Sequence, residues 1–179
     1  MKLGWRRILA WLIDWACILP WIAVTAAIGV PLYLTGVIEP NGILMANLIG
    51  ALVMVVPVVI VTAWCESRSI SATPGKRALR LRVSAGSQQS RFRITLVRNL
   101  LKIGLPWILG HAGVYAIVAS SQGSTSTSTG AWILIALAYV IAIIYVASLF
   151  VASGRAPYDR ITGLNVELEP RDLSLDAGS

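Results

Sequence analysis

Asp14 is the residue of this sequence best placed to do chemistry inside a membrane, because it interrupts a long apolar run that has no other charge after Arg7. An unpaired carboxylate in the hydrocarbon region costs several kcal/mol, so Asp14 must face protein or water. It either binds a cation or a proton, or forms a buried helix-to-helix salt bridge with Arg98 or Lys102. Arg7 lies on the same helix face, about 10 Å away along the axis. Both roles stay open at this point.

Three further ionisable residues lie in or beside apolar runs. Asp159 and Arg160 closely follow the last run, where an aspartate–arginine cluster with Arg7 is within reach. Ordinary surface pairing is the alternative and would contribute little stability. His111 lies inside the third run, where it either relays protons or, as we favour, bonds a neighbouring backbone carbonyl.

The candidate ion or proton site, or buried ion pair, therefore comprises Arg7, Asp14, Arg98 and Asp159. Secondary candidates are Lys76, Lys102, His111 and Arg160.

Other kinds of chemistry find little support in the residue types. The chain has one histidine and two cysteines, too few for a zinc site or a disulfide framework. Gly75-Lys76 is not a phosphate loop, because Ile70 and Arg77 stand where that motif needs a glycine and a hydroxyl residue. No nucleophile–base pair or pair of catalytic carboxylates is evident. We expect neither an enzyme nor a bound cofactor or metal.

Four apolar runs must position these charges, at about residues 8–34, 43–64, 103–119 and 131–151. Apolar residues make up 56% of the chain and charged residues 13%, whereas soluble domains contain about 25% charged residues. Runs of about 20 apolar residues are long enough to cross a bilayer as helices. The third run is short, with a proline near its start. The sequence predicts an all-α membrane protein with four transmembrane helices, in a single domain over residues 1–179.

Basic residues predict how this protein lies in the membrane. Every Lys and Arg falls within residues 2–7, 68–102 or 155–171, and the connections 35–42 and 120–130 contain none. Positive charge is retained on the cytoplasmic side. We therefore expect both termini, the loop 65–102 and the tail 152–179 to be cytoplasmic, which requires an even number of spans.

The cytoplasmic segments carry two periodic patterns. Residues 88–102 repeat apolar side chains at helical spacing beside a basic stripe of Arg91, Arg98 and Lys102, which predicts an amphipathic interfacial helix facing anionic headgroups. Residues 79–84 and 164–169 alternate apolar with basic or acidic residues, which predicts a two-stranded β-ribbon with arginine–glutamate pairs. Two unpaired tails are the alternative. No motif indicates nucleic-acid binding.

Three segments together resemble the RDD family of bacterial membrane proteins: RRILAWLID at 6–14, TPGKR at 73–77 and DRITG at 159–163. Family members usually have threonine after this last glycine, where Leu164 stands here. The resemblance implies a bacterial inner-membrane protein whose family-defining residues are Arg7, Asp14 and Asp159. The resemblance also implies a role in transport, the activity usually suggested for the family, with sodium/proton exchange proposed for some members.

Two functions follow as hypotheses. In the first, a small transporter binds a cation or proton at Asp14, is gated by Arg7, Arg98 and Asp159, and conducts at a homodimer interface because four helices enclose little space. In the second, a non-transporting assembly or accessory protein docks a membrane-protein partner or anionic lipid on its basic face.

Overall fold

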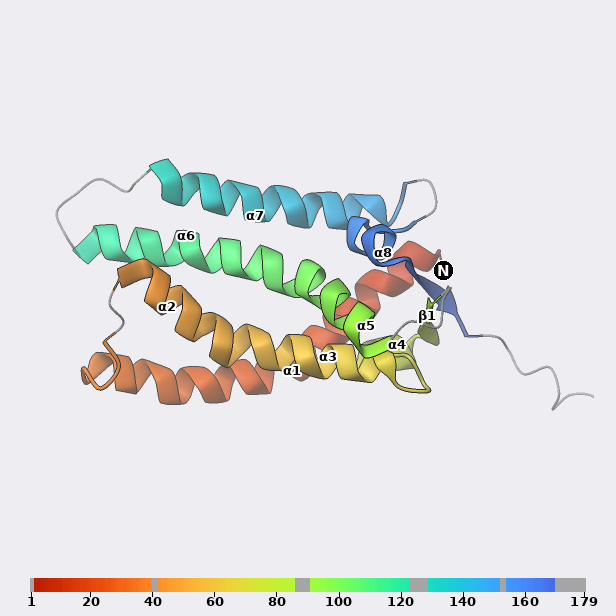
Figure 1. The fold of residues 1–179 in the computed structure, drawn as a ribbon, viewed down its shortest axis with the longest axis horizontal. Helices are drawn as coiled ribbons and strands as arrows, with labels where there is room; N and C mark the ends of the chain where they lie inside the picture. Colours follow the sequence, from red (N-terminus) through yellow and green to blue (C-terminus); the bar gives the residue numbers. More distant parts are fainter. Residues whose placement is uncertain (1, 40–41, 86–90, 123–128, 152–153, 170–179) are drawn as a thin grey trace, which may run out of the picture.

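Four long helices lie side by side in the computed structural model, which describes residues 2–39, 42–85, 91–122, 129–151 and 154–169 (Figure 1). The first is α1 (Leu3–Leu34), and the fourth is α7 (Thr129–Ser148). The second helix joins α2 (Gly42–Gly50), the π-helix η1 (Ala51–Val55) and α3 (Val56–Ser67). The third helix joins α5 (Arg91–Asn99), the π-helix η2 (Leu100–Gly104) and α6 (Leu105–Gln122). All four are long and apolar enough to cross a membrane.

Small residues allow some of these helices to approach closely. At Gly113 of α6, an added Cβ would lie 2.5 Å from Ile135 of α7. Because lipid is as apolar as the side chains, membrane helices associate through such close packing rather than through hydrophobic burial. The outward faces of the bundle carry many exposed large apolar side chains, as a surface in contact with lipid should.

The helix bounds differ at several ends from those that hydropathy predicts. α1 begins at Leu3 rather than residue 8, and α7 ends at Ser148 rather than 151. The short third run is continuous with the amphipathic helix through η2, so the membrane-length helix extends from Arg91 to Ser120. Hydropathy shortens this helix because it contains buried basic residues. Residues 88–90 of the predicted amphipathic helix lie outside the described residues.

The two π-helices lie against each other inside the bundle. An added Cβ at Gly104 of η2 would lie 3.8 Å from Val55 of η1. Wider helical turns disturb the regular backbone bonding, and π-segments occur often at functional sites. Here aromatic side chains donate to two of their carbonyls: Tyr145 Oη to Leu101 at 2.9 Å, and Trp21 Nε1 to Val53 at 3.3 Å.

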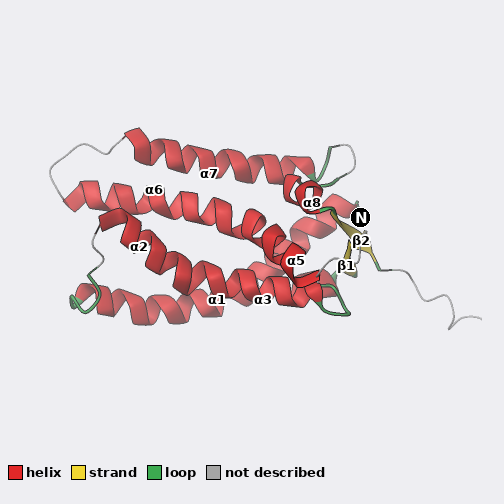
Figure 2. Ribbon diagram, viewed as in Figure 1, coloured by secondary structure: helices red, strands yellow, loops and turns green. Residues whose placement is uncertain are grey.

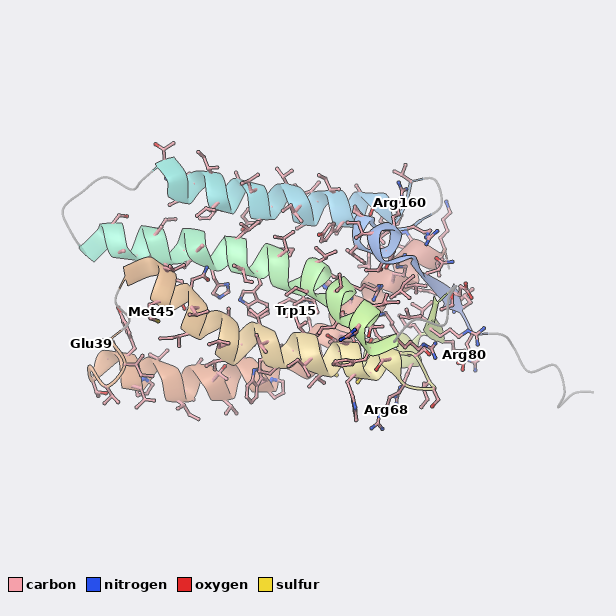
Figure 3. The ribbon with its side chains drawn as sticks, viewed as in Figure 1. Trp15, Glu39, Met45, Arg68, Arg80 and Arg160 are labelled. Carbon is pink, nitrogen blue, oxygen red and sulfur yellow. The ribbon has the colours of Figure 1, made fainter. Side chains whose placement is uncertain are left out.

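The remaining elements are gathered at one end of the bundle, called here the charged end (Figure 2). They are the short helices α4 (Pro74–Ala78) and α8 (Pro157–Thr162) and the strands β1 (Leu81–Ala85) and β2 (Leu164–Leu168). The amino terminus of α1 lies at this end too (Figure 1). Figure 3 shows Arg68, Arg80 and Arg160 at the charged end, and Glu39 at the opposite end.

The predicted β-ribbon is confirmed. β1 and β2 pair antiparallel, from Leu81 opposite Leu168 to Ala85 opposite Leu164. Four strand residues form a buried apolar cluster with Ala10 of α1, so the ribbon rests on the start of the first helix: Leu81, Val83, Leu164 and Val166. A two-stranded ribbon alone is marginal in water, and this support stabilises it.

Two local details of this region differ from the prediction. β1 starts at Leu81 rather than residue 79, because Arg80 adopts a left-handed backbone (φ 52°) that turns the chain after α4. Arg82 does lie opposite Glu167, but the Glu167 carboxylate accepts a hydrogen bond from Ser84 Oγ at 2.6 Å, and the ion pairs among the described residues include none across the ribbon.

Candidate functional site

Five buried charged residues form a connected group at the charged end, called here the charge cluster: Arg7, Glu66, Lys76, Arg98 and Asp159. Arg98 of α5 is its centre. Its Nη1 donates to Glu66 Oε2 at 2.7 Å, and its Nε donates to Asp159 Oδ1 at 2.8 Å. A guanidinium is suited to this bridging role because its donors point in fixed directions within one plane.

Arg7 and Lys76 pair with the remaining oxygens of the Asp159 and Glu66 carboxylates. Arg7 of α1 pairs with Asp159 of α8 and also donates to the Gly154 carbonyl at 2.7 Å. Lys76 of α4 pairs with Glu66 of α3. Asn99 adds a bond to Glu66 Oε2 at 2.8 Å. The cluster thereby joins five helices, α1, α3, α4, α5 and α8, from both ends and the middle of the sequence.

The two cluster members that lie outside the membrane-length helices, Lys76 and Asp159, each have a pKa below its ordinary value. Burial by itself would raise the pKa of Asp159, but the guanidinium groups of Arg98 and Arg7 lower it below its ordinary value. Burial lowers the pKa of Lys76, and the Glu66 carboxylate offsets part of that shift. Glu66 and Asp159 are completely buried, so removing a partner would leave a buried charge uncompensated.

Asp14 has a different environment. Its Oδ2 accepts from the Thr73 hydroxyl at 2.7 Å, and its Oδ1 accepts from the Gly75 backbone N–H at 2.8 Å. The ion pairs found among the described residues do not include it. A salt bridge of Asp14 with Arg98 or Lys102, one of the two roles expected for it, is therefore not among these ion pairs, and Arg7 also pairs elsewhere. Both guanidiniums instead use the carboxylate that α8 brings to the charged end.

The bonds to Asp14 are made by the first turn of α4. Pro74 starts this short helix, a position where its missing N–H costs nothing. Asp14 binds the amino-terminal end of that helix, where Thr73 and Gly75 are buried. Gly75 is packed so closely on α1 that an added Cβ would lie 2.0 Å from the Ala10 carbonyl oxygen. Only glycine permits this contact.

A small cavity of about 20 Å³ lies beside Asp14, large enough for about one water. It is lined by residues from α1, α3, the loop before α4 and the third helix: Trp11, Asp14, Trp15, Ile18, Thr62, Thr73, Lys102, Ile103 and Trp107. Lys102, expected on an exposed basic stripe, is half-buried here, and Arg98 of the same stripe is fully buried. The stripe therefore faces protein in part rather than only headgroups.

An aromatic stack continues from this cavity along the third helix. Trp15 of α1 stacks on Trp107 at 5.5 Å between ring centroids, and Trp107 stacks on His111 at 5.3 Å. Trp107 Nε1 donates to His111 Nε2 at 2.9 Å, while His111 Nδ1 lies 3.2 Å from the Trp107 carbonyl oxygen. Both ring nitrogens are thus engaged by Trp107. The contact with the Trp107 carbonyl is the kind that we favoured for His111, whereas the bond from the indole was not predicted.

The structure sorts the predicted residues into three groups. Arg7, Arg98, Asp159 and Lys76 belong to the charge cluster; Asp14 and Lys102 line the cavity; and His111 and Arg160 lie apart, the latter exposed. Sequence reasoning missed Glu66. The available signal was an acid that directly ends an uncharged apolar run, a position where most helices carry a basic anchor. Among the described residues, no group of three or more His, Cys, Asp or Glu is arranged to hold a metal ion.

Four membrane-length helices with buried charges gathered at one end define a multi-pass membrane protein. The RDD family model matches residues 3–163, which include every member of the charge cluster and Asp14, and the chain belongs to the RDD family. No curated protein and no solved structure matches the chain.

Proposed function

We propose that this protein moves a small monovalent cation or a proton across the membrane, with Asp14 as the binding carboxylate. The observation that supports this most is the difference in partners. Asp14 is buried and accepts only neutral donors in the described structure, whereas Glu66 and Asp159 are paired with cations. An ionisable residue inside a span that lacks a charged partner is suited to exchange ions.

The cavity narrows the class of substrate. Its size suits a water-sized guest such as a dehydrated alkali cation or a hydronium, and excludes organic solutes. Three of its lining side chains carry oxygen atoms: Asp14, Thr62 and Thr73. Oxygen is the donor that hard cations prefer. The site therefore favours lithium, sodium or protons, in the manner of a cation/proton exchanger.

The charge cluster would close the site on one side. Arg7, Arg98 and Asp159 join α1, α5 and α8, so opening requires that these ion pairs separate together. We place this end in the bacterial cytoplasm, with both termini inside, because basic residues are retained there. A path at a homodimer interface suits four helices better than a pore within one chain.

The alternative is a non-transporting accessory protein, and one observation favours it. Asp14 holds the first turn of α4 against α1 through Thr73 and Gly75, which is a structural task. The exposed Arg68, Arg80 and Arg160 would then dock anionic headgroups or an acidic partner protein.

Ion flux in proteoliposomes separates the two functions. The wild-type protein should carry a sodium or lithium flux coupled to protons, and Asp14→Asn should abolish it while the protein stays folded. Glu39→Gln is the matched control, since Glu39 is an exposed acid at the opposite end. Absence of flux from folded wild-type protein would exclude transport and favour the accessory role.

Cysteine labelling tests the orientation. A cysteine in the connection 120–130 should react from outside, and one at Ser87 from inside. Reaction of both from the same side would contradict four spans.

A further inference from the structure

Lys102 is a basic residue near the charge cluster that forms none of the ion pairs of that cluster. It lies in η2 of the third helix, half-buried, and lines the same cavity as Asp14. No hydrogen bond or ion pair of its ammonium is found among the described contacts. A lysine at this depth needs a compensating charge or water, since an isolated ammonium in a poorly hydrated interior is costly.

The carboxylates of the cluster are already used. Both oxygens of Glu66 have cationic partners, Lys76 on Oε1 and Arg98 on Oε2. Both oxygens of Asp159 do as well, Arg98 on Oδ1 and Arg7 on Oδ2. Asp14, whose two described donors are neutral, is the acid that lines the same cavity as Lys102.

The backbone holds Lys102 in this place. Its neighbour Leu101 has its carbonyl bound by Tyr145 of α7, and its other neighbour Ile103 lines the cavity. The wider turn of η2 is packed against η1. The ammonium is therefore attached to a fixed backbone by a long, flexible side chain.

We propose that Lys102 is an internal cation that competes with the transported ion for Asp14. In the empty site its positive charge lies in the field of the carboxylate, and an arriving cation must displace it. Lys102 is thus a residue that sets affinity and allows release rather than an ion ligand. This inference rests on the proposed transport function and adds the element that regulates its binding step.

The test measures the half-saturating concentrations of lithium, sodium and potassium in proteoliposome flux for wild type, Lys102→Met and Lys102→Arg. Removing the competing charge should lower each half-saturating concentration by about tenfold, and by a similar factor for each ion, because a charge repels all cations alike. The maximal flux should fall, since release becomes slower. Lys102→Arg keeps the charge and should restore wild-type values.

Two additional variants serve as controls for this comparison. Lys102→Gln gives the same charge change with a polar side chain and serves if the methionine variant does not fold. Arg160→Met removes an exposed charge from the same end and should change nothing. If both neutral Lys102 variants show saturable, Asp14-dependent flux with an unchanged or higher half-saturating concentration, the proposed role of Lys102 is overturned. The transport proposal would stand in that case. Absence of Asp14-dependent flux in wild type would overturn the transport proposal and this inference together.

Discussion

The charge cluster and the Asp14 cavity lie at the same end of the bundle, but they satisfy their carboxylates in different ways. In the cluster each oxygen of Glu66 and Asp159 has a cationic partner. At the cavity, Asp14 has two neutral donors and an adjoining space. A fully paired group resists change because separating any pair exposes a buried charge. A carboxylate held by neutral donors keeps its negative charge available to a mobile cation.

This difference indicates separate roles for Arg7, Asp14 and Asp159, the three residues that the family resemblance singles out. Arg7 and Asp159 are paired with each other and hold α1 against α8. Asp14 lies two turns further along α1 and bonds a different segment. We infer that the first two shape the protein and that the third serves its function, which the following variants test.

The largest effect should come from Arg98→Met, which leaves Glu66 and Asp159 each short of a partner. The free energy of unfolding in detergent should fall by about 3–5 kcal/mol, as for other broken buried pairs. Arg160→Met, at an exposed site, should change it by less than about 0.5 kcal/mol. Equal stability of the two variants, in chemical or thermal unfolding, would show that the cluster is not the structural region.

Gly75→Ala should come next, because its Cβ has no room beside the Ala10 carbonyl. We expect a loss of about 2–4 kcal/mol, since backbone atoms must shift to relieve the overlap. Gly29→Ala is the control: Gly29 lies in α1, the helix that Gly75 packs against, with nothing within 4 Å of the added Cβ, and alanine there should be neutral or stabilising. Circular dichroism melting curves in detergent compare the two, and a stable Gly75→Ala variant would contradict the close contact.

Thr73→Val should have a smaller effect on stability, about 1–2 kcal/mol, because one bond to a charged acceptor is lost. If Asp14 binds the transported ion, the same change should also alter the half-saturating cation concentration. Thr62→Val is the control at the same cavity, since the Thr62 hydroxyl bonds carbonyls of its own helix. An equal effect of both variants on stability would argue against a special bond between Thr73 and Asp14.

The smallest effect should be a loss of wild-type stability that occurs only at acidic pH. The folded protein lowers the pKa of Asp159 below its ordinary 3.8, so this group adds stability above that pH and loses it as the pH falls through the lower, folded pKa. Melting temperature should therefore decline below about pH 4 in wild type. Asp159→Asn should be less stable near neutral pH and should show a weaker decline in acid. A decline as steep as that of the wild type would assign the acid sensitivity to other groups.

Much of this protein follows from the order of its residue types. Four apolar runs, one-sided basic residues and two alternating segments predicted the four helices and the ribbon, because lipid demands helices of a set length and a ribbon demands period-two alternation. The buried position of Asp14 within the first helix followed from the same reasoning. Helix ends were less well predicted, since hydropathy treats Arg98 and Lys102 as polar even where neighbouring carboxylates or a cavity accommodate them.

The partners of the charges were decided only by the tertiary structure. Sequence spacing places Arg7 and Asp14 on one helix face, but not the segments that reach them from elsewhere in the chain. α8 reaches Arg7 and the first turn of α4 reaches Asp14, while Glu66 of α3 reaches Arg98 of α5. An ion pair depends on a separation of a few ångströms, and that separation is set by how the helices pack rather than by the order of residues along any one of them.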